Sequence, residues 1–276
     1  MQPIRVACVR YLNTQPLIHG LDRVQGLTLL PCVPSAIGAM VARGEADVGL
    51  ASIVDAVTIE PPLALLPVGM IGCDGPTLTV RIFSAVPIDR IAILHADTDS
   101  HTSVVLARLI LLKVYGVGPE VESHGPGDAD DPSRDPRLPE SVLLIGDKVV
   151  TDHPPAARYP YQLDLGEAWH TLTGLPFVYA MWMCRADHAE SSTIALARSL
   201  LERQLRHNLG RLEWLVAHHS PRSGWPLDLA RRYLGTLLRY EVGPRERTAL
   251  DTFFAMAVAS GLLPDRRPIE MLPTRL

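Results

Sequence analysis

Apolar residues along this chain fall into short runs that end in glycine or polar residues. Residues 4–9 form one such run, which predicts a buried strand. Residues 35–44 show helical spacing between Ser35, a suitable N-cap, and Gly44, a suitable C-terminal glycine. Residues 46–50 alternate apolar and polar positions, as in a half-buried strand. This succession predicts an α/β fold with a largely parallel sheet.

The same pattern continues to the end of the chain. Ser52 is expected to cap a short helix that contains Asp55. Residues 119–140 are rich in Pro, Asp, Gly and Ser, which predicts an exposed loop. Further strands are predicted at residues 78–84, 91–94, 142–145 and 178–183, and helices at 104–112, 192–208, 227–240 and 245–260.

The two strands at residues 78–84 and 178–183 enclose the middle of the chain. We expect the chain to leave one lobe by the first strand and return by the second, so that both act as hinges. This predicts a first lobe of residues 1–84 plus 182–276 and a second lobe of residues 85–181. A ligand cleft is expected between the lobes, because ligands favour such interfaces.

Composition narrows the class of protein. The 276 residues carry a formal net charge of only −4, and no basic run is interleaved with aromatic residues, which argues against nucleic-acid binding. We see no secretory signal and no apolar run near the ~20 residues that span a bilayer. We therefore expect a cytoplasmic protein with no membrane partner. The four cysteines are far apart, which does not favour a disulfide framework or a zinc site.

Polar residues that follow the predicted strands are the first candidates for ligand binding. Asn13 and Thr14 come just after the first strand, at the end where open α/β sheets bind ligands. Asparagine serves turns equally often. Gly146 and Asp147 follow another strand; Gly146 would allow close approach to the backbone, and Asp147 could orient a hydroxyl, cap a helix or act as a base.

The start of the helix near residue 104 is a candidate anion site. Ser100, Thr102 and Ser103 offer three hydroxyl groups beside the free amides of a helix N-terminus, more than capping requires. Thr79 and Arg81 are further candidates, and Arg81 is suited to a bidentate grip on a carboxylate. We find no nucleotide-binding or metal-binding motif.

Several of these segments together resemble a known family. The resemblance is carried by residues 11–17 (YLNTQPL), 44–50 (GEADVGL), 73–76 (CDGP), 100–103 (SHTS), 143–148 (LLIGDK), 163–169 (LDLGEAW) and 173–182 (TGLPFVYAMW). They are similar to the motifs of the menaquinone-biosynthesis chorismate dehydratases of the futalosine route. Thr79 stands where that family usually has serine, and His101 where it usually has arginine. Arg10 also departs from the usual small or polar residue.

The resemblance implies a two-lobed α/β fold like that of type II periplasmic binding proteins, with two hinge strands. It implies elimination of water from chorismate, a dicarboxylate, giving 3-[(1-carboxyvinyl)oxy]benzoate without a metal or organic cofactor. A homodimer is compatible with the sequence.

The positions of the candidate residues and the resemblance together give an expected role for each of them. Asn13, Thr79 and Asp147 would be catalytic. Substrate would be bound by Thr14, Ser52, Arg81, Ser100, His101, Thr102, Ser103 and Gly146. No residue stands out as the catalytic base, and a carboxylate of the substrate could serve.

Two other functions compete with this hypothesis. The first is a sister enzyme of the same pathway that makes 1,4-dihydroxy-6-naphthoate; the YLNT segment argues against it. The second is a small-anion binding protein without activity, which the lack of an export signal disfavours.

Overall fold

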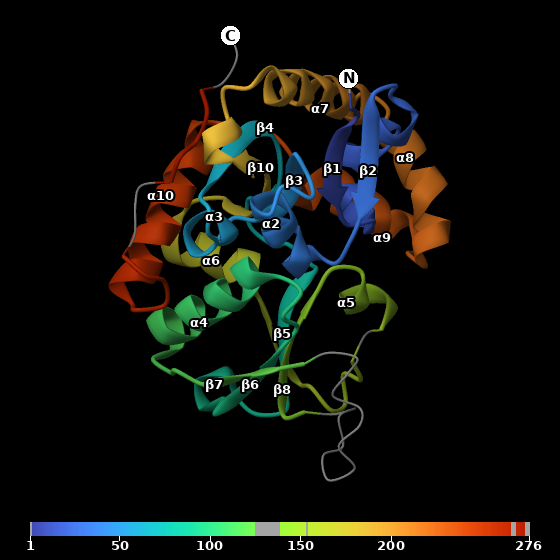
Figure 1. Cartoon of the computed structure of the whole chain (residues 1–276). Coiled ribbons are helices and arrows are strands. Elements are labelled where there is room, and N and C mark those ends of the chain that lie inside the picture. The colour runs from blue at the N-terminus through green and yellow to red at the C-terminus, as the bar shows by residue number, and fades with distance from the viewer. Residues whose placement is uncertain (1, 125–138, 153, 266–268, 274–276) are drawn as a thin grey trace, which may run out of the picture.

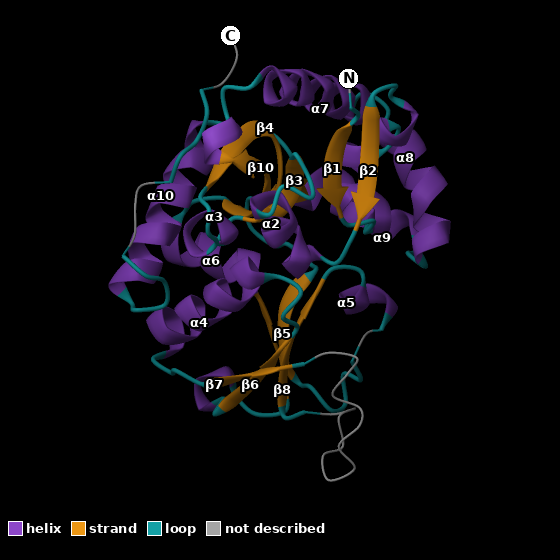
Figure 2. Ribbon diagram, in the orientation of Figure 1, coloured by secondary structure: helices purple, strands orange, loops and turns teal. Residues whose placement is uncertain are grey.

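Two β-sheets with helices around them make up the molecule (Figure 1). The computed structural model describes residues 2–124, 139–152, 154–265 and 269–273. Figure 2 shows the two sheets lying one above the other, with most helices on the outside. The larger sheet has the strand order β11-β4-β10-β3-β1-β2, and the smaller sheet the order β7-β6-β8-β5-β9.

The larger sheet is mixed, which corrects the expectation of a largely parallel one. Its strands are β1 (Ile4–Cys8), β2 (Leu27–Pro31), β3 (Val48–Ser52), β4 (Leu63–Cys73), β10 (Phe177–Arg185) and β11 (Leu238–Arg239). Strand β1 pairs in parallel with β2 and β3, but β10 runs antiparallel to β3 and β4. The reason is the path of the chain, because β10 follows the last strand of the smaller sheet and inserts between β3 and β4 of the larger sheet.

The smaller sheet is built from the middle of the chain. Its strands are β5 (Val80–Ser84), β6 (Ile93–Ala96), β7 (Glu120–Ser123), β8 (Ser141–Ile145) and β9 (Tyr161–Asp164). The chain thus passes from one sheet to the other between β4 and β5 and returns between β9 and β10. The predicted lobe boundaries, residues 1–84 plus 182–276 and residues 85–181, stay predictions.

Helices cover both sheets. They are α1 (Gln15–Ile18), α2 (Pro34–Ala42), α3 (Asp55–Thr58), α4 (His101–Tyr115), α5 (Lys148–Thr151), α6 (Leu165–Thr173), α7 (Ser192–Leu209), α8 (Leu212–His219), α9 (Leu227–Arg232) and α10 (Pro244–Ala259). The Ser100 side chain caps the start of helix α4 by accepting a hydrogen bond from the Ser103 amide. The helix ends at Gly116, which adopts the left-handed conformation. No helix in the described ranges is long and apolar enough to span a bilayer.

Three predicted elements differ from the structure. Ser52 ends β3 and does not cap α3, whose N-cap is Val54. Residues 120–123, predicted as loop, form β7, while residues 125–138 lie outside the described residues. The helix predicted at residues 227–240 ends at Arg232, because the chain then forms a π-helical turn and Leu238 pairs with Cys73 of β4.

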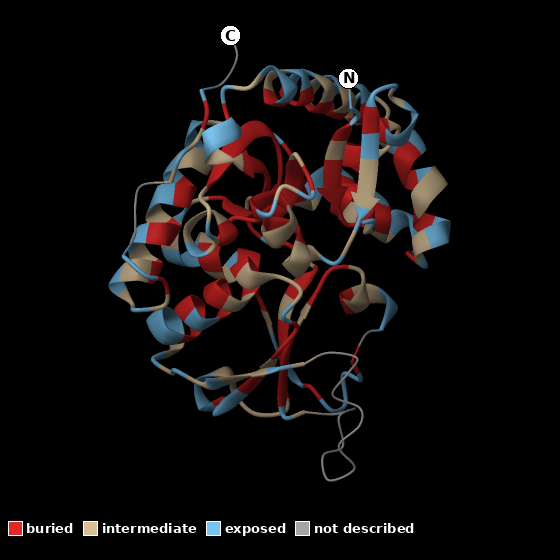
Figure 3. Ribbon diagram, viewed as in Figure 1, coloured by how far each residue is buried: buried red, intermediate tan, exposed pale blue. Residues whose placement is uncertain are grey.

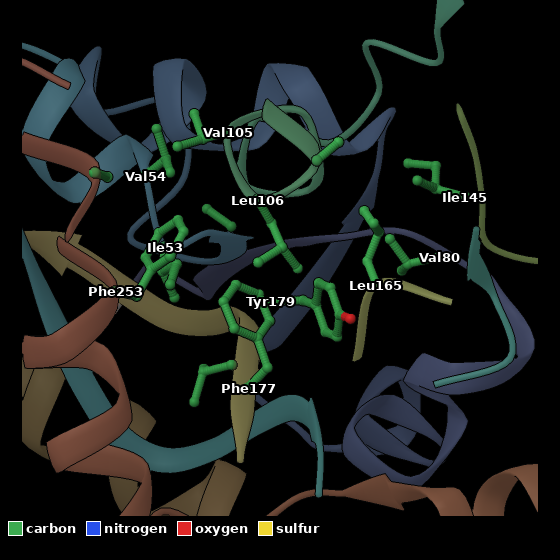
Figure 4. Packing of buried hydrophobic residues seen from close by; sticks show 14 of the residues in the cluster. Ile53, Val54, Val80, Val105, Leu106, Ile145, Leu165, Phe177, Tyr179 and Phe253 are labelled. Carbon is green, nitrogen blue, oxygen red and sulfur yellow. The ribbon is translucent and has the colours of Figure 1, made fainter. Parts of the chain in front are cut away.

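A continuous apolar core joins the two sheets. Buried residues are concentrated in the strands and on the inner faces of the helices (Figure 3). One cluster includes Val80 and Leu143 of the smaller sheet together with Met181 of the larger one. Figure 4 shows Leu106 of α4, Phe177 and other members of this cluster packed side by side. This core holds the sheets in a fixed relation and so fixes the pocket between them.

Candidate functional site

A pocket lies where residues from both sheets meet. The space inside it, about 630 Å³, includes a part that is open to solvent. Its lining residues are Val9, Tyr11, Asn13, Pro34, Leu50, Ser52, Ile71, Thr77, Thr79, Val80, Ser100, Ser103, Ile145, Gly146, Tyr179, Ala180, Tyr233 and Leu238. Six of the predicted site residues are therefore brought together in one place: Asn13, Ser52, Thr79, Ser100, Ser103 and Gly146.

Polar groups of this pocket are neutral. Within the described residues, its lining includes hydroxyl groups and one side-chain amide, but no Asp, Glu, His, Lys, Arg or Cys side chain. Apolar side chains such as Val9, Leu50 and Ile145 form the rest of the wall. Such a lining suits a ligand with an apolar ring and polar substituents that accept or donate hydrogen bonds.

Asn13 is presented by a tight turn that directly follows β1. The hydroxyl of Thr14 donates to the carbonyls of Val9 and Tyr11, at 3.0 and 2.8 Å. Thr14 is fully buried and holds this turn, so it does not line the pocket as predicted for a substrate-binding residue. The Asn13 side chain hydrogen-bonds to Tyr233, and its Oδ1 is buried without a partner in the described structure. That oxygen is an acceptor available to a ligand.

The start of α4 forms a second polar corner of the pocket. The Ser100 and Ser103 hydroxyl oxygens are 2.9 Å apart, and both side chains line the pocket. The first turn of a helix directs unpaired backbone N–H groups outward, and a helix of 15 residues has a positive N-terminal end. A carboxylate can therefore be bound here without a cationic side chain.

Two predicted residues of the same turn have other partners. His101 Nδ1 lies 2.6 Å from Oδ1 of Asp55 on α3, and Asp55 is fully buried. Its hydrogen bond with Asp55 raises the pKa of His101 above the ordinary value. Thr102 is buried and accepts a hydrogen bond from the Val54 amide at 3.4 Å. Both residues tie α4 to the larger sheet and do not line the pocket.

The backbone conformation at position 146 favours glycine. Its φ is +69°, and a Cβ atom there would lie 3.3 Å from the ring of Tyr11. The close approach of a ligand to the Gly146 backbone stays a prediction, and the group of the protein that approaches it is the Tyr11 ring. Lys148, beyond it, bonds to Asp97 and Asp99 at 2.6 and 3.1 Å, which are contacts within the region of the smaller sheet.

Asp147 bridges the sheets instead of lining the pocket. One carboxylate oxygen accepts from the Leu12 amide at 3.1 Å, and the other from the indole N–H of Trp225 at 3.0 Å. Burial raises the pKa of Asp147, and the two hydrogen bonds partly offset the rise. The structure thus favours a positioning role over the predicted direct catalytic one.

Arg81 is directed away from the pocket. Its guanidinium donates to Asp164 at 3.3 Å and to Gln162 at 3.1 Å. The pairing of β5 with β9 sets Arg81 directly opposite Asp164. The substrate-binding role of Arg81 stays a prediction, and the pairing of two strands gives the arginine an acidic neighbour that sequence spacing does not reveal.

Sequence reasoning missed four polar lining residues: Tyr11, Thr77, Tyr179 and Tyr233. Tyr11 and Tyr179 belong to the segments that carry the family resemblance, which was the signal available. Tyr233 lies within a predicted helix, where a buried tyrosine is ordinarily part of the core. Among the described residues, no three His, Cys, Asp or Glu side chains are grouped as a metal site would need.

Comparisons of the sequence agree on one family. Residues 4–259 match the model of a family described as menaquinone biosynthesis. The chain is 30% identical over 267 residues to chorismate dehydratase of Thermus thermophilus, covering 92% of this chain and 94% of that protein. It is 24% identical over 124 residues to chorismate dehydratase of Campylobacter jejuni, covering 45% of this chain and 52% of that protein.

Comparisons of the structure agree on the fold. A protein from Archaeoglobus fulgidus superposes with a TM-score of 0.70 at 16% identity, covering 95% of this chain and 98% of that one. The periplasmic aliphatic sulphonate binding protein SsuA of Escherichia coli superposes with a TM-score of 0.63 at 13% identity, covering 100% of this chain and 96% of that one. These likenesses confirm the predicted fold of periplasmic binding proteins.

Proposed function

Because this chain belongs to the menaquinone-biosynthesis family, we propose that it is a chorismate dehydratase, a hydro-lyase that removes water from chorismate. The product is 3-[(1-carboxyvinyl)oxy]benzoate. The near full-length match to the Thermus thermophilus enzyme supports the activity. The observation in the structure that carries the proposal is the neutral pocket between the sheets, with an unpartnered amide oxygen on one wall and a helix N-terminus on another.

The pocket has hydrogen-bond donors for a carboxylate of the substrate. Chorismate has two carboxylates, and the Ser100 and Ser103 hydroxyls with the first amides of α4 provide donors for one of them. Ser52 and Gly146 also line the pocket, and the Ser52 hydroxyl and the Gly146 backbone provide further polar contacts. Apolar residues such as Val9 and Leu50 would face the ring.

Asn13 and Thr79 are assigned to the reacting part of the substrate. The free Oδ1 of Asn13 can accept a hydrogen bond from the ring hydroxyl of chorismate and so orient it. Thr79 is 2% exposed and its hydroxyl can donate or accept beside the same position. Asp147 acts on this part of the site through the Leu12 amide, one residue before Asn13.

The ring proton must be removed as the hydroxyl leaves, which makes the ring aromatic. Because none of the described lining residues is an Asp, Glu, His, Lys or Cys, we assign the base to a carboxylate of the substrate itself. The enzyme then contributes mainly by holding that carboxylate close to the proton that it takes. The cytoplasmic location and the homodimer remain predictions.

Turnover of chorismate tests the proposed function. Purified protein is incubated with chorismate, and the mixture is analysed by mass spectrometry for a product lighter by one water. Formation of 3-[(1-carboxyvinyl)oxy]benzoate at a rate proportional to enzyme supports the proposal. Binding of chorismate without product would instead support an anion-binding protein, a role for which the fold alone is suited. If chorismate is neither bound nor converted, the sister enzyme that forms the naphthoate is the better assignment.

A further inference from the structure

Tyr233 is placed in the pocket by an irregular part of the chain. Helix α9 ends at Arg232, and Tyr233–Leu237 forms a π-helical turn before β11. The Tyr233 side chain is only 1% exposed and lines the pocket. Its hydroxyl oxygen lies 2.6 Å from the Thr79 hydroxyl and also hydrogen-bonds to the Asn13 side chain. The phenol thus sits between the two residues assigned to the reacting part of the substrate.

The ring of Tyr233 is packed against a second aromatic ring. Trp225 stacks on it, with ring centroids 4.8 Å apart and planes inclined by 13°. The indole N–H of Trp225 donates to Asp147, which also accepts from the Leu12 amide next to Asn13. One carboxylate from the segment after β8 therefore fixes both the tyrosine, through Trp225, and the asparagine, through the backbone.

The hydroxyl of Tyr233 can offer its proton to a ligand when Thr79 is the donor of the hydrogen bond between them. Thr79 and Asn13 hydrogen-bond to the phenol and partly offset the rise of its pKa that burial causes. Either hydroxyl can be the donor between Thr79 and Tyr233, and when Thr79 donates to the phenol oxygen, the proton of Tyr233 is left for a pocket ligand. Because burial keeps the pKa of Tyr233 far above its ordinary value, the phenol stays protonated at neutral pH.

We propose that Tyr233 is a further catalytic residue, which donates its hydroxyl proton to the departing oxygen of chorismate, and that Trp225 and Asp147 are positioning residues for it. This inference rests on the proposed function. It adds a role for the C-terminal segment, which none of the sequence motifs covers.

The step balances as follows. The ring C–H bond breaks, its proton passes to the substrate carboxylate, and its electron pair enters the ring. The C–O bond breaks with its electron pair going to oxygen, which takes the proton of Tyr233 and leaves as water. The carboxylic acid of the product then loses its proton, and the phenolate regains one, so that the enzyme is unchanged after one turnover.

Tyr233→Phe tests the proton donor, with Tyr240→Phe as its matched control. Tyr240 lies in the same segment, its hydroxyl is buried without a partner in the described structure, and it does not line the pocket. We expect Tyr233→Phe to lower kcat by about 100-fold with KM changed less than about threefold. Tyr240→Phe should stay within about twofold of the parent. Thermal unfolding shows whether both proteins are folded. If they are, equal kcat values for Tyr233→Phe and the parent protein would overturn the proposal.

A substrate analogue separates proton donation from simple packing. In a chorismate analogue with fluorine in place of the ring hydroxyl, the leaving group is fluoride, which needs no proton. The effect of Tyr233→Phe on kcat should then shrink to less than about tenfold. If the variant is impaired equally with both substrates, Tyr233 is not the proton donor. If the parent protein makes no product from chorismate, the proposed function itself has failed.

The positioning residues are tested at Trp225. Trp225→Phe keeps an aromatic ring against Tyr233 but removes the donor to Asp147. We expect kcat to fall by about tenfold with KM nearly unchanged. Trp214→Phe is the control, because Trp214 lies exposed on α8. If both tryptophan variants give the parent's kcat, Trp225 and Asp147 have no positioning role.

Discussion

Asn13 shows how a single residue is set in place by its neighbours. Thr14 closes the turn after β1 through two carbonyls, and Asp147 holds the amide of Leu12. The asparagine side chain is thereby directed at the pocket with one oxygen unpartnered. Because a buried acceptor without a partner is costly, a bound ligand that donates to it gains more than the same contact would give in water.

Replacing Asn13 by alanine should separate activity from stability. We expect Asn13→Ala to lower kcat by about 100-fold, because the oriented hydroxyl loses its acceptor. The free energy of unfolding should change by less than about 1 kcal/mol, since the amide makes few bonds in the free protein. Steady-state kinetics and urea unfolding measure the two quantities, with Gln25→Ala, an exposed amide, as control. Unchanged turnover in Asn13→Ala would remove this residue from the site.

Gly146 gives a prediction about stability. Alanine at its φ of +69° would be strained, and its Cβ would press on Tyr11 at 3.3 Å. We expect Gly146→Ala to lower the free energy of unfolding by about 1–2 kcal/mol. Gly118→Ala is the matched control, since a Cβ there meets nothing within 4 Å and its φ is ordinary. Denaturant unfolding measures the free energy of unfolding of both variants. Equal values for Gly146→Ala and Gly118→Ala would show that the turn adapts to a side chain.

Only part of the site could be predicted residue by residue. Asn13, Ser100 and Gly146 follow strands or begin a helix, so their position alone placed them near a sheet edge. Tyr233 carries no such signal, because a buried tyrosine in a helical pattern is ordinarily a core residue. The ion pair of Arg81 could not be predicted, because its partner, Asp164, comes beside it only through the pairing of β5 with β9.

Helix α4 has a structural and a binding role at the same end. Ser100 and Ser103 face the pocket, whereas His101 and Thr102 of the same turn contact α3 and the residue before it. This division fixes the N-terminus of α4 against the larger sheet while its first amides stay free to bind an anion.

The His101–Asp55 pair predicts how stability depends on pH. Its carboxylate partner raises the pKa of His101 above the ordinary 6.5. The stabilisation by this pair is therefore complete below pH 6.5 and is lost as the pH rises through the raised value. The Tm of the parent minus that of His101→Gln should fall across this window, with His207→Gln, an exposed histidine, as control. A difference independent of pH would show that the pair is not ionic.

At the element scale, local signals were most reliable where a cap and a breaker agree. In helix α4, Ser100 caps the start and Gly116, in the left-handed conformation, ends it. The predicted helix at residues 227–240 failed because its apolar spacing continues past Arg232, while pairing of Leu238 with Cys73 draws the chain into the larger sheet. Such pairing between distant residues overrides local propensity.

At the scale of the whole molecule, polar contacts between the two sheet regions surround the pocket. Asp147 reaches Leu12 and Trp225 on one side, and His101 reaches Asp55 on the other. The arrangement of the sheets and the predicted fold agree with the binding proteins that the chain resembles. Part of the pocket is open to solvent, and in its enclosed part the hydrogen bonds of a ligand to neutral donors are stronger than in water.

Removing Asp147 should weaken the contacts between the two sheet regions. Asp147→Ala leaves the Leu12 amide and the Trp225 indole without their acceptor, which costs about 1–3 kcal/mol. We expect small-angle X-ray scattering to give a larger radius of gyration for the variant than for the parent, with both saturated by product. Asp152→Ala, at an exposed position, is the control. Identical radii for the variant and the parent would show that Asp147 does not hold the sheets together.

The crystal structure of the protein with bound 3-[(1-carboxyvinyl)oxy]benzoate tests the central claim most directly. We predict that the ring lies against Asn13 and Tyr233 and that a carboxylate contacts Ser100 and Ser103 at the start of α4. A product molecule bound elsewhere, with this pocket empty, would contradict the account.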